Sequence, residues 1–82
     1  MIEIVDGTAT RTFTVERHGV TEDAPFHEPN ADAFRRELQQ RGLRPDGDVT
    51  VASIDEQEPD RHGQPHTVIT YQVDLQSEEG QG

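Results

Sequence analysis

Apolar and polar residues alternate with a period of two over 2–5 and 11–17, a pattern that predicts two β-strands. Both segments are rich in the β-branched and aromatic residues that favour strands. Residues 6–10 separate them and include Gly7, which can take the positive φ that a tight turn requires. We therefore expect the chain to open with a β-hairpin.

The spacing of apolar residues changes to that of a helix after a loop over 18–29. Ala31, Phe34 and Leu38 fall on one face of such a helix. Asn30 is a favourable N-cap residue, so we expect the helix to start there. We expect it to end at Gly42, because glycine adopts the left-handed conformation of a C-terminal cap at little cost.

A second pair of strands is predicted over 48–54 and 66–75, joined by a polar loop over 55–65. The element order ββαββ predicts an α+β fold with four strands in one mixed sheet and the helix on one face. A right-handed crossover favours the strand order 2-1-4-3, in which the first and last strands lie parallel at the centre. We expect 1–75 to form this single domain and 76–82 to form a flexible acidic tail.

Several segments of the chain resemble the ubiquitin-like β-grasp superfamily. Met1–Glu16 is similar to the first hairpin of ubiquitin without a gap, and within it Arg11–Glu16 is similar to the second strand. Gly42–Asp46 looks like the exit from the ubiquitin helix, and Thr67–Leu75 stands where the last strand leads into the C-terminal tail. The resemblance covers most of the chain and implies a β-grasp fold.

Modifiers and sulfur carriers of that superfamily end in Gly-Gly, and their terminal carboxylate is adenylated and then joined to an amine or to sulfur. The resemblance would place this chemistry at Gly80 and Gly82. Gln81 interrupts the glycine pair, and Glu78 and Glu79 replace the basic residues of the ubiquitin tail. A modifier or sulfur carrier acting through Gly82 is therefore an alternative to the main prediction.

The charge balance of the chain is strongly acidic. Seventeen Asp and Glu residues face seven basic residues, all of them Arg, which gives a formal net charge of −10. This charge disfavours binding to nucleic acid and to anionic membranes. A patterned, acidic and Lys-free chain is typical of halophilic archaea, in which salt screens the repulsion between carboxylates. No signal-like or membrane-spanning segment stands out, so we expect a cytoplasmic location.

The four histidines are the candidate metal ligands. His18 and His27 lie in the loop before the helix, and His62 and His66 lie in the loop between the last two strands. The predicted topology brings these loops to one end of the sheet, where imidazoles and carboxylates together could bind Zn²⁺ or another divalent ion. Their spacing matches no standard zinc motif. Metal binding is therefore a second alternative, and we predict no cofactor.

The sequence carries no catalytic motif. Cysteine is absent, Ser53 lies in a predicted strand, Ser77 lies in the tail, and no glycine-rich phosphate loop follows a strand. We therefore predict a non-enzymatic protein-interaction module that uses an edge strand or the sheet face away from the helix. Because apolar residues make up only 29% of the chain, the core is thin, and we expect the partner to be another protein or a second copy in a homodimer.

Overall fold

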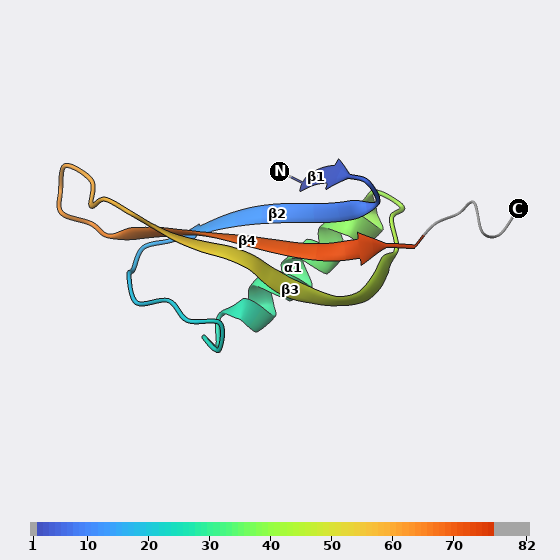
Figure 1. Cartoon of the computed structure of the whole chain (residues 1–82), viewed down its shortest axis with the longest axis horizontal. Coiled ribbons are helices and arrows are strands. Elements are labelled where there is room, and N and C mark those ends of the chain that lie inside the picture. The colour runs from blue at the N-terminus through green and yellow to red at the C-terminus, as the bar shows by residue number, and fades with distance from the viewer. Residues whose placement is uncertain (1, 77–82) are drawn as a thin grey trace, which may run out of the picture.

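The computed structural model describes residues 2–76 and shows an α+β fold in which one sheet carries one helix (Figure 1). In chain order the elements of this part of the chain are β1 (Ile2–Val5), β2 (Thr8–Val15), α1 (His27–Gln40), β3 (Pro45–Gln57) and β4 (His66–Leu75). The predicted α+β class and the order ββαββ are confirmed. Gly80 and Gly82 of the predicted tail lie outside the described residues.

The strand order is β1-β2-β4-β3, and every neighbouring pair is antiparallel. The predicted order 2-1-4-3 and its parallel central pair are therefore wrong, because β4 lies beside β2 and not beside β1. Strand length gives the physical reason. β2 pairs with β4 continuously from Thr8↔Asp74 to Val15↔Thr67, whereas the four-residue β1 would leave much of the ten-residue β4 unpaired.

The first hairpin is tighter than predicted. Val5 and Thr8 are paired residues, so the connection is the two-residue turn Asp6-Gly7. Both turn residues have positive φ, 51° and 78°, as a type I′ turn requires. β2 therefore begins at Thr8, three residues earlier than the predicted strand over 11–17.

The helix begins at His27, so the prediction of Asn30 as the N-cap is wrong. Phe26 is the N-cap residue and makes no side-chain cap hydrogen bond. Pro29 lies in the first turn, where its missing N–H would have no partner within the helix in any case.

The end of the helix is as predicted. Gly42 has φ of 75°, its N–H bonds to the carbonyl of Gln39 at 3.0 Å, and Leu43 N–H bonds to that of Leu38 at 2.9 Å. These two bonds make a Schellman cap.

β3 is longer than the predicted strand over 48–54. It includes Pro45 and Gly47, and its register with β4 shifts between Asp46 and Thr50 and again between Val51 and Ser53. Asp46 and Gly47, which precede the predicted strand, are therefore part of an irregular edge strand.

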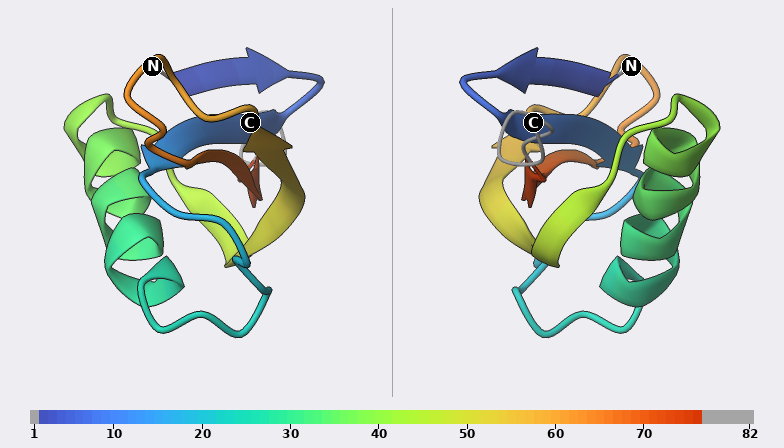
Figure 2. Two further views of the ribbon diagram at one scale, coloured as in Figure 1. Left: turned by 90° about the vertical axis from the view of Figure 1, so that its left-hand side faces the viewer. Right: turned by 90° about the vertical axis from the view of Figure 1, so that its right-hand side faces the viewer.

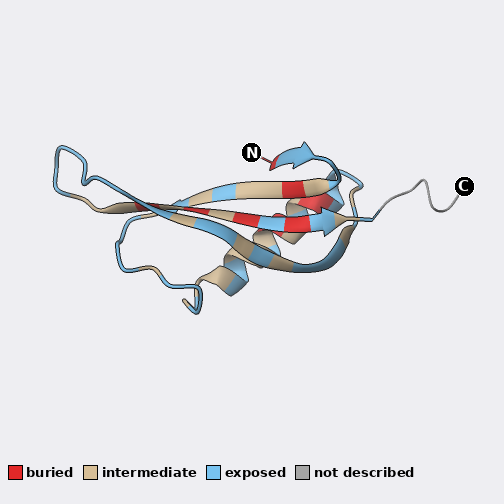
Figure 3. Ribbon diagram, in the orientation of Figure 1, coloured by how far each residue is buried: buried red, intermediate tan, exposed pale blue. Residues whose placement is uncertain are grey.

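The core lies between α1 and one face of the strongly curved sheet (Figures 2 and 3). Its fully buried apolar side chains include Phe34 and Leu38 of the helix, with Ile69 and Tyr71 of β4 beneath them. Burial of each such side chain contributes about 1.5–3 kcal/mol to the free energy of unfolding. No helix among residues 2–76 combines the length and the apolar character needed to cross a bilayer.

Candidate functional site

The first half of α1 and the facing part of β3 form the two sides of a groove. Two adjoining hollows of about 410 and 320 Å³ share the lining residues His27, Ala31 and Val49. The further lining residues of the two hollows are Glu22, Glu28, Asp32, Arg35, Asp48, Thr50, Val51 and Tyr71. We call this region the α1–β3 groove.

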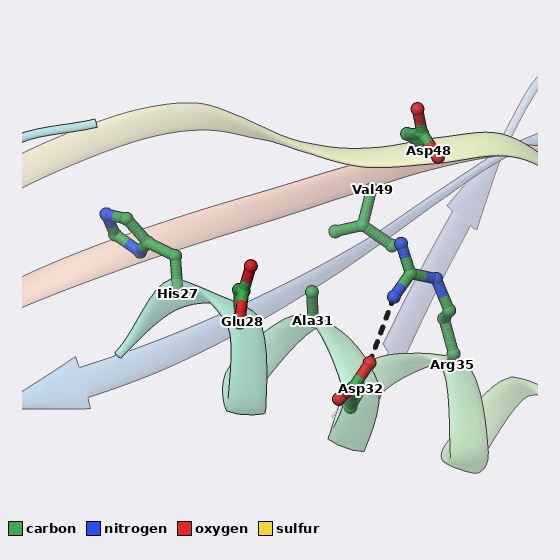
Figure 4. Close-up of a pocket in the computed structure, with 7 residues that line it drawn as sticks. All are labelled: His27, Glu28, Ala31, Asp32, Arg35, Asp48 and Val49. Atoms are coloured by element: carbon green, nitrogen blue, oxygen red, sulfur yellow. Dashed lines mark hydrogen bonds and ion pairs between the residues drawn. The ribbon is translucent and has the colours of Figure 1, made fainter. Parts of the chain in front are cut away.

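The groove exists because the helix packs on the sheet mainly through its second half. Phe34 and Leu38 are fully buried, whereas Ala31, one turn earlier, is small and leaves space against β3. Figure 4 shows Val49 pointing toward the helix, while Asp48 projects from the other side of the strand. Ala31, Val49 and Val51 are each half-buried, so together they give the groove an apolar strip.

A hydrogen-bond network lies at the floor of the groove. The Tyr71 hydroxyl is 2.5 Å from His27 Nδ1 and accepts a bond from the Asn30 amide at 3.1 Å. His27 Nε2 lies 2.7 Å from the carbonyl oxygen of Thr21. Because a carbonyl only accepts, Nε2 carries a proton, and in the neutral imidazole Nδ1 then accepts from the Tyr71 hydroxyl.

This network gives His27 a structural role. Both ring nitrogens are engaged within the chain, so the imidazole ties the loop at Thr21 to the start of the helix and to β4. Burial raises the pKa of the Tyr71 phenol above its ordinary value, and the Asn30 hydrogen bond offsets part of that effect. The polar atoms at the floor of the groove therefore have hydrogen-bond partners within the chain.

The rim of the groove is acidic. The carboxylates of Glu22, Glu28 and Asp32 line it, together with the cation Arg35, whereas the carboxylate of Asp48 projects away from the helix. Arg35 is paired with Asp32 at 3.1 Å, one turn away on the same helix (Figure 4). The rim therefore carries an excess of negative charge that its own arginine does not balance.

A second exposed feature is the edge strand β1, which among residues 2–76 pairs with β2 alone. Ile4 and Val5 are 46% and 65% exposed, and they are the exposed large hydrophobic residues of the described chain. The β1 sequence Ile-Glu-Ile-Val contains no Pro and no Lys, and its pairing with β2 has no bulge. Such an edge offers unpaired backbone groups to another strand.

The sheet face away from the helix is rich in hydroxyl groups. Alternate residues of β2 (Thr8, Thr10, Thr12 and Thr14) share this face with Thr70 and Val68 of β4. The Thr12 and Thr70 hydroxyls are 3.5 Å apart, and Thr8 donates to Asp74 at 3.0 Å. This face is mainly polar, and the exposed apolar side chains lie on the β1 edge instead.

The candidate metal ligands do not converge. His18 Nε2 is 2.8 Å from the carbonyl oxygen of Gln57, and His27 belongs to the Tyr71 network. His66 is 3.3 Å from Asp60, whereas His62 contributes only its backbone N–H to that carboxylate. Within residues 2–76, no three His, Cys, Asp or Glu residues lie close enough to hold a metal ion.

Asp60 instead organises the loop between β3 and β4. Its carboxylate accepts the backbone N–H groups of Gln64 at 3.0 Å and His62 at 2.8 Å. These two bonds, followed by the contact with His66, lower the pKa of Asp60. The loop histidines therefore belong to a local turn stabilised by one carboxylate.

Neither the groove nor the Tyr71 network was predicted from the sequence. Tyr71 and His27 are 44 positions apart, so no local pattern connects them. One usable signal was present: the only Tyr of the chain lies at an inward position of the most apolar strand, where a buried hydroxyl needs a partner.

The chain was compared with protein-family models, with curated proteins and with solved structures. None of these comparisons finds a match to it.

Proposed function

We propose that the chain is a non-enzymatic protein-interaction module that associates with a second copy of itself through β1. The observation that carries the proposal is that a sheet edge without proline, lysine or a bulge also exposes Ile4 and Val5. Two copies of such a strand can satisfy each other's backbone groups and bury apolar surface at the same time.

The opposite edge of the sheet supports this choice by contrast. β3 contains Pro45 and two register shifts, and acidic residues such as Asp46, Asp48 and Asp55 lie along it. Bulges, proline and charge are the usual devices that prevent a sheet edge from pairing. The two edges therefore differ in the way expected if only β1 is used for association.

A register centred on Ile4 suits a symmetric pair of antiparallel β1 strands. It places Ile4 opposite Ile4 of the other copy and Glu3 opposite Val5 of the other copy. A register centred on Glu3 would place like charges directly opposite each other, which destabilises a strand pair. The Ile4 register is thus the one expected in a dimer.

The test is to measure the molar mass by light scattering in KCl and compare two lysine variants. Val5→Lys puts a charge on the β1 edge, and Thr12→Lys makes the same change of charge on the exposed hydroxyl face. We expect dimers for the wild type and for Thr12→Lys, and monomers for Val5→Lys. A monomeric wild type, or a dimeric Val5→Lys, would contradict the proposal.

The register can be tested with single cysteines, because the chain contains none of its own. Ile4→Cys should form an intermolecular disulfide on mild oxidation, and Thr12→Cys should remain a free thiol. Equal cross-linking of both variants would indicate that the disulfides form by random collision between molecules and not at a defined interface.

A modifier or sulfur-carrier role through Gly82 stays a prediction from the sequence. The β4–β2 pairing removes the parallel central strands on which the fold argument for it depended.

A further inference from the structure

The α1–β3 groove combines an apolar strip with an acidic rim. Ala31 on the helix faces Val49 and Val51 on β3, and all three side chains remain partly accessible. Strips of this kind accept aliphatic side chains, because contact removes apolar surface from water on both partners.

The ring nitrogens of His27 and the hydroxyl of Tyr71, at the floor of the groove, already have hydrogen-bond partners within the chain. His27 Nε2 is bonded to Thr21, Nδ1 is bonded to Tyr71, and the Tyr71 hydroxyl also receives the Asn30 amide. A polar group pressed against this floor would lose its bonds to water without gaining new ones, which costs free energy. The floor thus selects for an apolar part of the ligand.

The rim selects for positive charge. Within residues 2–76, Glu22 and Glu28 form no ion pair, whereas Arg35 is already paired with Asp32. Guanidinium or ammonium groups of a ligand could therefore pair with these carboxylates. Ion pairs in direct contact are screened less by salt than charges that are farther apart.

We propose that the α1–β3 groove binds a partner peptide segment in which Arg or Lys side chains flank aliphatic ones. The aliphatic side chains lie on the strip of Ala31, Val49 and Val51, and the cations reach the acidic rim. The proposal is independent of self-association, which uses the opposite edge of the sheet at β1.

A suitable probe is a synthetic peptide of Arg, Leu and Ala without aromatic residues. Tyr71 is the only Tyr and the chain has no Trp, so intrinsic fluorescence reports on the groove floor alone. Titration calorimetry gives the dissociation constant independently. We expect saturable binding accompanied by a change in Tyr71 fluorescence, and no binding of the same peptide with Glu in place of Arg.

Matched variants distinguish peptide binding at the groove from general attraction of the peptide to the negative charge of the chain. Glu28→Gln and Glu58→Gln each remove one exposed carboxylate, at the groove and in the loop between β3 and β4 respectively. We expect Glu28→Gln to weaken peptide binding about threefold to fivefold, as for the loss of an exposed ion pair, and Glu58→Gln to leave it nearly unchanged. Equal effects of the two variants would overturn the proposal.

Ala31→Arg tests the apolar strip. This variant fills the space opposite Val49 with a cationic side chain and should abolish binding, while Thr12→Arg on the exposed hydroxyl face should bind as the wild type does. Circular dichroism establishes whether each variant is folded. If Ala31→Arg does not fold, the comparison of Glu28→Gln with Glu58→Gln still tests whether the peptide binds at the groove. Unchanged binding by folded Ala31→Arg, or no binding by the wild type, would contradict the proposal. Loss of the chain's own dimer in Ala31→Arg would identify the occupant as a second copy and would also overturn it.

Discussion

Tyr71 joins three parts of the chain through one side chain. Its ring packs edge-on against Phe13 of β2 with centroids 5.4 Å apart, and its hydroxyl contacts His27 and Asn30 of α1. The residue is 1% exposed and lies in the central strand β4. It therefore couples the sheet, the helix start and, through His27, the loop at Thr21.

The phenol of Tyr71 should titrate above its ordinary pKa of 10.0 in the folded chain, because burial disfavours the phenolate. The native state then holds a proton that the unfolded chain has released. This contribution to the free energy of unfolding is present below the ordinary pKa and is lost as the pH rises through the folded value. Ultraviolet absorbance of the phenolate measures the titration directly, since Tyr71 is the only Tyr.

The same titration in concentrated guanidinium chloride supplies the reference for the unfolded chain. The Tyr71→Phe variant should show no phenolate absorbance and should also be less stable, since His27 and Asn30 each lose a hydrogen-bond partner. Coincident titrations of the folded and the unfolded chain would contradict the buried position of the hydroxyl.

At the scale of elements, an ion pair fixes the helix on the sheet. Arg11 of β2 points to the helix side, lies over the Phe13 ring at 4.3 Å and contacts the Glu37 carboxylate of α1 at 3.2 Å. Both side chains are partly covered, 22% and 34% exposed. The Arg11 hydrogen bond is the largest cause of a lowered Glu37 pKa.

Glu37→Gln should lower the free energy of unfolding at neutral pH by about 0.5–1 kcal/mol, discounted for solvent exposure. A folded pKa below the ordinary 4.5 means that the unfolded chain takes up the proton first as the pH falls. The contribution of the pair is thus complete above that pH and is lost as the pH falls through the folded pKa. Urea unfolding of both proteins across this range should show their difference shrinking in acid.

Asp32→Asn is the control for this prediction. Asp32 also pairs with an arginine at 3.1 Å, but its side chain is 62% exposed and the pair lies within one helix. We expect little change in its free energy of unfolding. A larger loss for Asp32→Asn than for Glu37→Gln would show that the bridge between β2 and α1 contributes no more than a surface pair.

Elements governed by local chemistry could be predicted from the sequence, and their assembly could not. The helical stripe of Phe34 and Leu38 and the Gly42 cap depend on neighbouring residues, and both are found. The helix start was predicted wrongly because the Asn30 side chain bonds to Tyr71 and does not cap the helix N-terminus. This contact forms only when β4 and the helix pack together, so the local sequence does not reveal it. Strand order was missed for a similar reason, since it depends on which strand matches β4 in length.

At the scale of the whole molecule, charge and apolar surface are distributed unevenly. The β1 edge exposes Ile4 and Val5, the α1–β3 groove is rimmed by carboxylates, and the face of Thr12 and Thr70 is mainly hydroxyl. The two proposed binding surfaces can act together, because a dimer formed at β1 would present two grooves. A bivalent partner would then bind more tightly than either groove alone allows.

Net charge governs the last prediction. A formal charge of −10 on 82 residues, with a core of few buried side chains, destabilises the compact state by repulsion between carboxylates. Added salt shortens the Debye length from about 10 Å at 0.1 M to about 3 Å at 1 M and so screens this repulsion. We expect the thermal midpoint of unfolding to rise as KCl is increased over this range, measured by circular dichroism.

Salt could also raise the midpoint by favouring a dimer, and the Val5→Lys variant, which we expect to be monomeric, separates these causes. Stabilisation by dimer formation depends on protein concentration, whereas screening within one chain does not. If repulsion within the chain is the cause, Val5→Lys should keep most of the dependence on KCl at every protein concentration. A midpoint that is flat or falls with KCl in both proteins would remove the argument for a salt-adapted chain, because nothing else in its composition demands high salt.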